Sequence, residues 1–570
     1  MAATLPRNGD VAAQLELLAD LLEIEGTPSF RVLAYRRAAT RIRETATPVA
    51  ELALGGRARD LPGIGATIED KIVQIVRDGE VKALRDRKER IPQGIIAFLR
   101  LPGLGPKTVR RIWQELGITT VDELREAAAE QRLRQLGGLG PKTEENILRA
   151  LEREEPEGDD RLLLGAALPA LRELVAELRE HPAVERISEA GSARRRKETL
   201  RDVDLIATAT DPASLTEEFT RHAAVADVVA HGPTKATVVW QNALRFDLRV
   251  VPPECYGNLL QHFTGSKDHN VALREDAVRR GFSVSEYGIQ VVETGEVFTA
   301  EDEAGVYERL GYEPIAPELR ENRGELEAAR RGELPALVEV SGLRADLHAH
   351  TTWSADGHAT VAQLAAAARE RGYEYMAVTD HSHYLREGRL EAQRREIEAV
   401  AERVAPLRIV RGIEVNILTD GSLDVADEIL AECEWVIASL HRAFDQSPTE
   451  RLLAAVENPH VDCIGHPTAR KLGRRAGADV DLERLVERAA ETRTCLEINS
   501  QPDRLDLRDT HARVAAEAGV PIVVSSDAHR LHELAHVELG VAQARRAWLT
   551  AEHVLNTRPW RKLQRYLESA

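Results

Sequence analysis

Two carboxylates at alternate positions of a predicted strand are the first residues that could carry chemistry. Asp202 and Asp204 begin the largely apolar run DVDLIA, which is typical of a β-strand. Because strand side chains alternate between faces, the two carboxylates should lie side by side on one face. Carboxylates this close repel each other unless a cation lies between them, and hard oxygen ligands suit Mg²⁺ or Mn²⁺.

The turn that precedes this strand could bind phosphate. Residues 191–195, GSARR, offer a backbone that can approach a ligand closely, a hydroxyl and guanidinium donors. An acid pair beside such a turn is typical of two-metal phosphoryl transfer, in which metals about 3.5–4 Å apart hold the attacking and leaving oxygens. A lone Asp-x-Asp is more often a solvated hairpin, so the hypothesis depends on the whole arrangement.

The pattern GS-x-RR…DVD resembles the palm motif of the X-family DNA polymerases, within the wider nucleotidyltransferase superfamily. That palm needs a third carboxylate on a neighbouring strand, and ALRFDLRVV supplies Asp247. The stretch HFTGSKDHNVALR resembles the nucleotide-binding segment of the family. The resemblance implies that Asp202 and Asp204 bridge the metals and that Asp247 ligates the catalytic metal and accepts the primer 3′-hydroxyl proton. It implies nucleotide binding by Gly191, Ser192, Arg195, His262, Phe263, Gly265, Asn270 and Arg274.

The chain departs from this family pattern at two positions. Arg201 stands where the family usually has glycine before the first aspartate, and the longer side chain could crowd the nucleotide. His262 stands where a tyrosine usually precedes the phenylalanine, which bears on the choice between deoxyribose and ribose.

From residue 345 onward, apolar runs alternate with amphipathic stretches. The runs read ADLHAHT, EYMAVTDHS, LRIVRGIEVNI, WVIASLH, DCIGHP, TCLEINS and IVVSSDAH. Seven βα units predict a closed parallel barrel, in which chemistry takes place at the C-terminal ends of the strands. Imidazole and carboxylate without thiolate suit Zn, Mn or Fe. The candidate ligands at these ends are His348, His350, Asp356, His381, Glu414, His441, His466, Asp527 and His529.

This set resembles the PHP domain (polymerase and histidinol phosphatase), whose signatures are D-x-H-x-H, T-D-H, G-x-E, G-H-P and D-A-H. The resemblance implies that the nine residues hold a trinuclear cluster of Mn²⁺, Zn²⁺ or Fe. Such a cluster generates hydroxide near neutral pH and clamps the scissile phosphate. With the palm motif, the resemblance to bacterial X-family polymerases with a fused PHP domain runs almost from end to end.

Three apolar-Gly-x-Gly turns near the N-terminus each precede a predicted helix. Such a turn lets the backbone reach a phosphate, and the helix N-terminus presents N–H groups to it without reading bases. One copy often does no more than join two helices, but three copies resemble helix-hairpin-helix motifs. The resemblance implies DNA-backbone binding at Gly63, Gly65, Gly103, Gly105, Gly138 and Gly140.

Lys71 occupies the position of the lyase nucleophile in some X-family relatives. A lysine there attacks an abasic sugar as a free amine and forms a Schiff base. The simpler interpretation is a surface lysine on a helix, and we favour it. Thr67, at the position of a supporting phosphate-binding lysine, also argues against lyase activity.

Length and composition limit the classes of protein that fit. The 570 residues are too many for one core, and the net charge of −18 argues against a purely electrostatic DNA binder. Four scattered cysteines, Cys255, Cys433, Cys463 and Cys495, are most simply reduced packing residues of a cytoplasmic protein. We find no signal peptide and no apolar run long enough to span a membrane.

The predicted fold is multidomain, with an all-α helix-hairpin-helix region, an α/β nucleotidyltransferase palm and a C-terminal (β/α)7 PHP barrel. We expect the N-terminal helical domain at 1–90, fingers at 91–155, palm and thumb at 156–315, a linker at 316–340 and the PHP domain at 341–570. We expect the chain to act as a monomer.

The leading hypothesis is a repair enzyme that fills short gaps by templated nucleotidyl transfer and trims DNA as a 3′→5′ exonuclease. AP endonuclease or 3′-phosphatase activity at the barrel is a further option. The substrates would be dNTPs and gapped or 5′-phosphorylated duplex DNA. Two alternatives stay open: a barrel that acts as a small-molecule phosphoesterase, and a DNA-end-binding nuclease whose polymerase site is impaired by Arg201.

Overall fold

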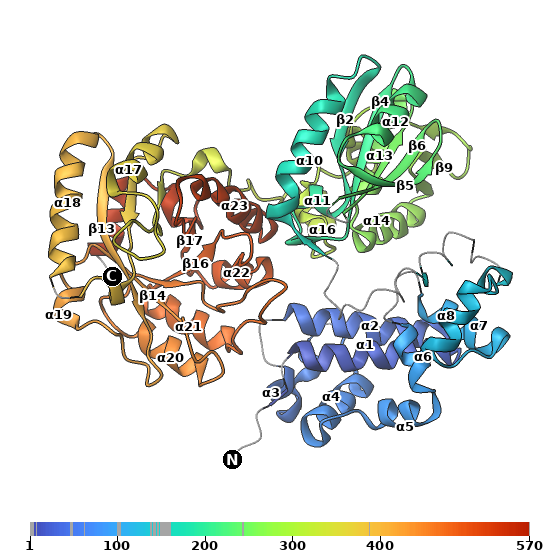
Figure 1. The fold of residues 1–570 in the computed structure, drawn as a ribbon, viewed down its shortest axis with the longest axis horizontal. Helices are drawn as coiled ribbons and strands as arrows, with labels where there is room; N and C mark the ends of the chain where they lie inside the picture. Colours follow the sequence, from blue (N-terminus) through green and yellow to red (C-terminus); the bar gives the residue numbers. More distant parts are fainter. Residues whose placement is uncertain are drawn as a thin grey trace. The chain divides into compact units, whose positions relative to one another are not determined.

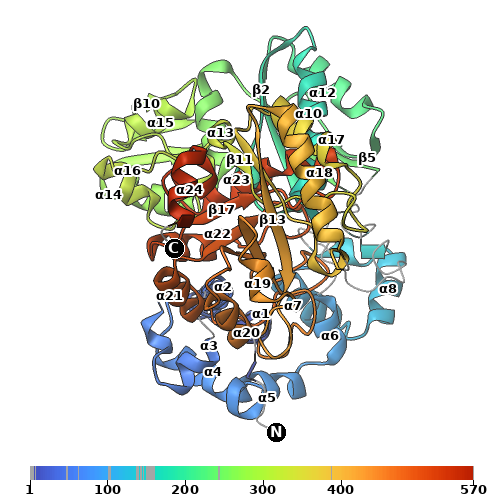
Figure 2. The same ribbon diagram turned by 90° about the vertical axis from the view of Figure 1, so that its left-hand side faces the viewer.

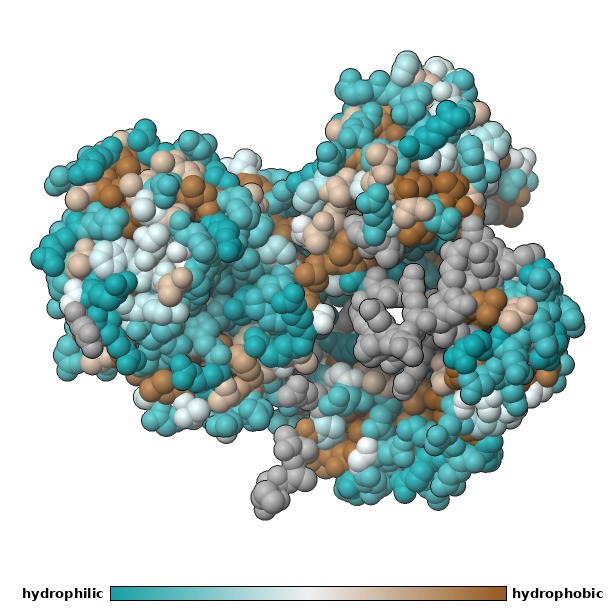
Figure 3. All heavy atoms as spheres, in the orientation of Figure 1, coloured by the Kyte–Doolittle hydropathy of each residue, from teal (hydrophilic) through white to brown (hydrophobic). Residues whose placement is uncertain are grey.

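The computed structural model describes residues 5–6, 8–45, 49–61, 63–99, 104–136, 140, 144, 147–148, 161–241, 244–386 and 388–568. The chain forms two compact units, Met1–Asp159 and Asp160–Ala570 (Figure 1). No helix among the described residues is long and apolar enough to cross a membrane. On the face drawn in Figure 3, hydrophilic residues cover most of the surface of the barrel.

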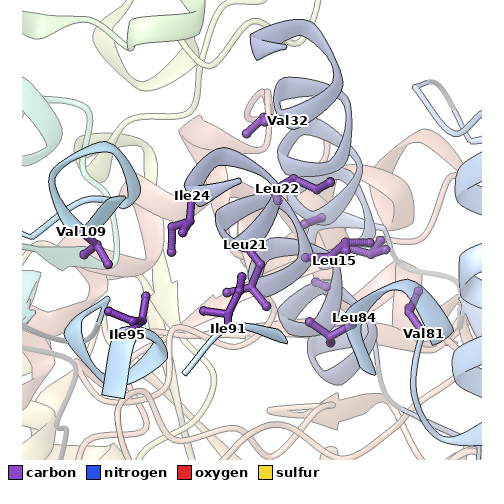
Figure 4. Close-up of a cluster of buried hydrophobic side chains, with 14 of the residues drawn as sticks. Leu15, Leu21, Leu22, Ile24, Val32, Val81, Leu84, Ile91, Ile95 and Val109 are labelled. Atoms are coloured by element: carbon purple, nitrogen blue, oxygen red, sulfur yellow. The ribbon is translucent and has the colours of Figure 1, made fainter. Parts of the chain in front are cut away.

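The described part of the first unit is helical and surrounds one apolar core. In α1 (Asn8–Ile24), Val11, Leu15, Leu18 and Leu22 recur every three or four residues, which places them on one face. That face packs against the other helices, and Figure 4 shows the side chains that meet there. The other helices are α2 (Ser29–Glu44), α3 (Val49–Leu54), α4 (Ala66–Asp78), α5 (Lys82–Arg90), α6 (Gln93–Phe98), α7 (Pro106–Leu116) and α8 (Val121–Ala129).

The second unit begins with a mixed sheet, which we call the palm sheet, in the order β2-β4-β7-β6-β5. Strands β4 and β7 run parallel, and the other adjacent pairs are antiparallel. The strands are β2 (Val184–Glu189), β4 (Asp202–Ala209), β5 (Val225–His231), β6 (Lys235–Trp240) and β7 (Arg245–Val250).

The alternation along β4 divides its side chains between two cores. Val203, Leu205 and Ala207 pack on one face against α10 (Leu164–Arg179) and α12 (Pro212–Arg221). Ile206 faces the other way and packs against α13 (Tyr256–Thr264). Because side chains two residues apart share a face, the predicted acidic pair of β4 lies on the α13 side.

A small second layer continues the palm. It contains α14 (Lys267–Arg279), a three-stranded sheet and α15 (Glu303–Arg309) around a separate apolar core. The strands are β8 (Phe282–Ser285), β9 (Gly288–Val291) and β10 (Val297–Phe298). The chain then runs through the short helix η4 (Pro317–Leu319) and α16 (Glu325–Arg331) toward the barrel.

Seven parallel strands in sequential order form the barrel. They are β11 (Ala345–Asp346), β12 (Tyr375–Val378), β13 (Arg408–Asn416), β14 (Trp435–Ser439), β15 (Cys463–Gly465), β16 (Cys495–Asn499) and β17 (Ile522–Ser525). A bridge between Ala349 and Ala528 joins the first strand to the last just beyond their ends. Strands β12 and β14–β17 are buried along their whole length, as expected for parallel strands covered on both faces.

Helices cover the outside of the barrel, and Figure 2 shows several of them. They are α17 (Val361–Glu370), α18 (Arg389–Val404), α19 (Asp427–Leu430), α20 (Pro448–Val456), α21 (Leu482–Thr492), α22 (Asp509–Glu517), α23 (Val537–Arg546) and α24 (Trp560–Glu568). This confirms the predicted order along the chain: a helical N-terminal region, an α/β palm and a (β/α)7 barrel. The bounds of the five predicted segments stay a prediction.

Candidate active sites

Strand register brings the three predicted palm carboxylates together. Asp204 on β4 lies directly opposite Asp247 on β7, and Asp202 shares the face of Asp204 two residues earlier. Burial raises the pKa of Asp204 to about 6, with further contributions from the charges of Asp202 and Asp247. A cation would remove this repulsion, so the donor set fits a hard divalent metal.

Two neighbours hold Asp247 in place. The Thr237 hydroxyl on β6 donates a hydrogen bond to Asp247 Oδ1 at 2.5 Å, and Arg245 Nε donates to Oδ2 at 2.9 Å. Neither residue was predicted from the sequence. Arg245 could have been found, because it lies two positions before Asp247 on the same strand face, whereas Thr237 depends on the register of β6 with β7.

The turn before β4 is a single helical turn, α11 (Gly191–Arg194), that lies against the acidic face. Gly191 has a φ of 60°, and a Cβ there would lie 2.6 Å from Asp204 Oδ2. Only glycine therefore allows this approach. Ser192 is half-buried on the same turn.

Side chains from distant segments hold the arginines of this turn. Arg194 donates to the Thr264 hydroxyl at 2.7 Å and pairs with Glu303. Arg195 Nε donates to Glu321 Oε1 at 3.1 Å, and its Nη1 donates to the Thr264 carbonyl. The turn is thus fixed by residues 69 to 126 positions later in the chain.

The predicted nucleotide-binding residues of α13 and α14 form one hydrogen-bonded group. Arg274 Nη2 donates to the ring Nδ1 of His262 at 2.8 Å, and the Asn270 amide donates to the His262 carbonyl at 2.7 Å. Burial, with the charge of Arg274, lowers the pKa of His262, so the ring is neutral and its Nδ1 accepts. Arg249 lies 4.3 Å above the Phe263 ring, and Gly265, with a φ of 69°, joins the two helices.

In the barrel, the nine predicted ligands meet at the C-terminal ends of the strands. The ring nitrogens of His441 and His466 each lie 3.2 Å from Glu414 Oε1, and His381 Nδ1 lies 2.7 Å from Glu414 Oε2. Asp527 Oδ1 lies 3.2 Å from His350 Nε2 and 3.6 Å from His348 Nε2. Asp356 Oδ2 lies 3.5 Å from the Nε2 atoms of both His381 and His529.

The buried atoms of this cluster fit metal ions better than they fit one another. His348 Nε2, both ring nitrogens of His350 and both oxygens of Glu414 are buried and form no hydrogen bond within the described chain. Such orphaned polar atoms are costly unless something binds them. Three groups place one ligand atom per residue within 4.8 Å of one another: His350–His381–His529, His348–His350–Glu414 and His381–Glu414–His441.

Side chains around the cluster orient the ligands. Glu497 Oε1 lies 2.7 Å from His348 Nδ1, and its Oε2 accepts from the His466 backbone at 2.7 Å. Asn416 Oδ1 lies 2.7 Å from His441 Nδ1, and the Asn499 amide donates to Asp527 at 2.9 Å. Carboxylate and amide partners of this kind orient the ligands of metal sites. None of the three was predicted from the sequence.

The helical unit places two predicted turns directly before helices. Gly65 directly precedes α4 and follows Gly63, which has a φ of 88°, and Gly105 directly precedes α7. Gly140 is described, whereas Gly103 and Gly138 lie outside the described residues. Lys71 lies on α4 with its ammonium 3.2 Å from Asp70.

Four protein families match the chain in consecutive segments. The family described as "Helix-hairpin-helix domain" matches residues 6–81, and "SAM-like Helix-hairpin-helix tandem" matches 95–153. "DNA polymerase beta thumb" matches 259–321, which includes most of α13 and all of α14. "PHP domain" matches 346–501, which carries seven of the nine barrel ligands.

One relative matches the chain over almost its whole length, and two others match about a third of it. The chain is 38% identical over 570 residues to "DNA polymerase/3'-5' exonuclease PolX" of Bacillus subtilis (strain 168), covering 98% of this chain and 99% of the relative. A protein of Thermoanaerobacter sp. (strain X514) named "Probable phosphatase" is 30% identical over 225 residues, 37% of this chain and 89% of its own length. A protein of that name from Vibrio campbellii is 30% identical over 217 residues, 35% of this chain and 82% of its own length.

Proposed function

Because the chain belongs to the X family of DNA polymerases that carry a C-terminal PHP domain, we propose that it fills short gaps during DNA repair and trims DNA ends. It is a DNA polymerase and 3′→5′ exonuclease, and both activities depend on divalent metals. The observation that carries the proposal is the presence of two separate groups of side chains that could ligate metal ions in one chain. One set lies on the palm sheet and the other inside the barrel.

At the palm, Asp202, Asp204 and Asp247 would hold Mg²⁺ or Mn²⁺, which would supply charge neutralisation for an in-line phosphoryl transfer. The turn at Ser192 and Arg195 would bind the triphosphate through its hydroxyl and guanidinium donors. Asp247 would accept the proton of the primer 3′-hydroxyl. Its two hydrogen-bond donors, Thr237 and Arg245, fix the orientation of this carboxylate.

At the barrel, the nine ligands would hold Mn²⁺, Zn²⁺ or Fe, which would supply a hydroxide for hydrolysis of a phosphodiester. The ring nitrogens of His348 and His441 that face away from the cluster are engaged by Glu497 and Asn416. This leaves the opposite nitrogen of each ring directed at the cluster, in the tautomer that a metal requires. The buried floor excludes bulk water beneath the cluster.

The test is to separate the two activities by mutation. A 5′-labelled gapped duplex is incubated with D247A or H348A, with and without dNTPs, in Mg²⁺ or Mn²⁺. Because a bound metal contributes several kcal/mol to such a transition state, D247A should lower extension by about 10³-fold while degradation stays, and H348A should do the reverse. Loss of both activities in a folded D247A protein would contradict the two-site proposal.

We further propose that the helical unit favours gaps with a 5′-phosphate. The N-terminus of α4 carries no side-chain cap and follows a glycine turn, so its N–H groups can bind an anion. Competition between phosphorylated and unphosphorylated gaps should show several-fold tighter binding of the former. Equal affinities would contradict this. Lyase chemistry at Lys71 stays the less favoured interpretation; the Lys71 ammonium lies 3.2 Å from Asp70, and the Lys71 side chain is 17% exposed.

The phosphatase relatives favour a second candidate for the barrel alone, hydrolysis of small phosphomonoesters. Turnover of a chromogenic phosphomonoester at a rate comparable to that of single-stranded DNA would support it. The impaired-polymerase alternative rests on Arg201, whose side chain is exposed to solvent. R201G should then raise extension by tenfold or more, and an unchanged rate would exclude that alternative.

A further inference from the structure

A buried arginine of the barrel contacts the turn that we propose binds the nucleotide. Arg546, the last residue of α23, is only 3% exposed. Its Nη1 donates to the backbone carbonyl of Arg195 at 2.7 Å and to Glu321 Oε1 at 3.0 Å. Its Nη2 donates to Asp509 Oδ2 on α22 at 2.7 Å. One guanidinium thus contacts three segments that lie far apart in the sequence.

The segment between the palm and the barrel transmits this contact to the nucleotide-binding turn. Glu321 Oε1 accepts a hydrogen bond from Arg546 and another from Arg195 Nε at 3.1 Å. One carboxylate oxygen therefore orients both guanidinium groups. The carbonyl of the preceding residue, Arg320, accepts from the Ser266 backbone at 3.0 Å, next to Gly265. Arg323 pairs with the same Asp509 oxygen at 3.0 Å.

Electrostatics favour a fixed geometry for this cluster. Although burial alone would raise the pKa of Glu321, the charges of Arg546, Lys197 and Arg195 lower it to about 2. The pKa of Asp509 is also lowered, because Arg546 and Arg323 outweigh the effect of burial. Both carboxylates are therefore charged at neutral pH, and removal of the arginine between them would leave buried charge with fewer partners.

We propose that Arg546, although it belongs to the barrel, is a positioning residue for the polymerase site. It fixes the backbone of the turn at Arg195 and the carboxylate that aims the Arg195 side chain. This inference rests on the proposed role of that turn in binding the triphosphate. A displacement of about 1 Å in such a group can lower the rate 10²-fold although the mutated residue lies outside the chemistry.

The neighbouring residue supplies a matched control. Arg545 lies in the same turn of α23 and also contacts the segment between the palm and the barrel. Its Nε donates a hydrogen bond to Glu318 at 2.8 Å, and its guanidinium pairs with Glu339. No contact described for Arg545 reaches the turn at 191–195. R545M should therefore remove contacts between the barrel and the segment that precedes it without moving the nucleotide-binding turn.

The experiment compares full-length R546M, R546K and R545M with the wild type. Single-nucleotide insertion on a one-nucleotide gap gives kcat and KM for dNTP, and degradation of single-stranded DNA reports on the barrel. We expect R546M to lower kcat/KM by about 10- to 100-fold, mainly through a higher KM. R545M should stay within about threefold of the wild type, as should the nuclease activity of both variants. R546K, which keeps the charge but not the forked geometry, should fall between.

Two results would overturn the inference. In one, R546M inserts nucleotides as efficiently as R545M. In the other, R546M loses both activities in parallel with a lowered melting temperature, which would indicate a purely structural role. If R546M does not fold, R546K provides the test. A kcat/KM of R546K equal to that of the wild type would exclude positioning by the forked contact. Failure of the wild type itself to insert nucleotides would instead contradict the proposed function.

Discussion

In the barrel, side chains on the barrel strands orient the candidate ligands. In the palm, side chains from segments outside the palm sheet hold the residues of the candidate site. Glu497 and Asn416 belong to barrel strands and contact His348 and His441 directly. In the palm, Arg195 is held by Glu321, which lies beyond the sheet and its second layer. The two sites therefore differ in how much of the chain must fold before each is complete.

This difference follows from the two architectures. A closed parallel barrel brings seven strand ends into one ring, so ligands and their supports come from adjacent strands. In the palm sheet, the neighbours β4 and β7 supply the carboxylates, and the bound nucleotide must be reached by side chains from helices and loops. We infer that the barrel site is preformed and resistant to single changes at its boundary, whereas the palm site can be adjusted from outside.

The first prediction concerns Glu497, a barrel side chain that supports two of the candidate ligands. E497Q keeps the size of the side chain but weakens its hold on His348 Nδ1 and on the His466 backbone. Loss of such an outer partner typically lowers metal affinity or activity 10- to 100-fold. We expect a decrease of about that size in nuclease activity and in metal retained after dialysis, measured by elemental analysis, with extension unchanged.

A matched control for E497Q lies on the same barrel away from the cluster. Glu434 pairs with Arg408 and Arg411 and contacts none of the nine ligands in the described structure. E434Q should retain both metal and nuclease activity. Equal metal content in E497Q and wild type would show that the ligands do not need this support.

The second prediction concerns His262 of the palm and the choice between deoxyribose and ribose. His262 Nδ1 accepts a hydrogen bond from Arg274, a contact that tyrosine cannot reproduce with its ring. The larger tyrosine ring in H262Y should instead pack against the sugar and disfavour a 2′-hydroxyl. One such contact contributes about 1–3 kcal/mol, so we expect the dNTP-to-rNTP ratio to rise by roughly 5- to 150-fold. Single insertions on a one-nucleotide gap measure the ratio, and an unchanged value would place the sugar gate elsewhere.

Local periodicity was enough to predict that the candidate metal ligands lie close together. The alternation of strand side chains correctly places Asp202 and Asp204 on one face, and the recurrence of polar residues at strand ends identifies the barrel cluster. Glu497 and Asn499 also carried a readable signal, since they alternate in a strand that is otherwise apolar and buried. That signal was overlooked because neither residue belongs to the family signatures.

The supporting contacts of the palm could not be predicted in the same way. Thr237 reaches Asp247 only because of the antiparallel register of β6 and β7. Glu303 and Arg546 lie more than 100 and 350 positions from the arginine turn that they contact. Such pairings depend on how whole layers pack, and a single sequence carries no periodic signal for them.

The third prediction concerns the contribution of charged side chains around the palm turn to the stability of the protein. Burial alone would raise the pKa of Glu303, but Arg320 and Arg194 outweigh it and lower the pKa to about 2. A carboxyl with a lowered folded-state pKa contributes stability that is present above its ordinary value of 4.5 and is lost as the pH falls toward 2. The contribution at pH 7 is on the order of 3 kcal/mol.

E303Q should therefore lower the unfolding free energy of the palm at pH 7 and flatten its decline between pH 4.5 and 3. Denaturant unfolding followed by far-UV circular dichroism at a series of pH values measures both effects. E301Q is the matched control, because Glu301 is largely exposed and pairs with Arg186 at 3.5 Å, where solvent screens the interaction. If E303Q and E301Q lost the same stability at pH 7 and declined with the same slope, the charges around Arg194 would not hold the turn. The palm would then be as self-supporting as the barrel, and the contrast between the two sites would disappear.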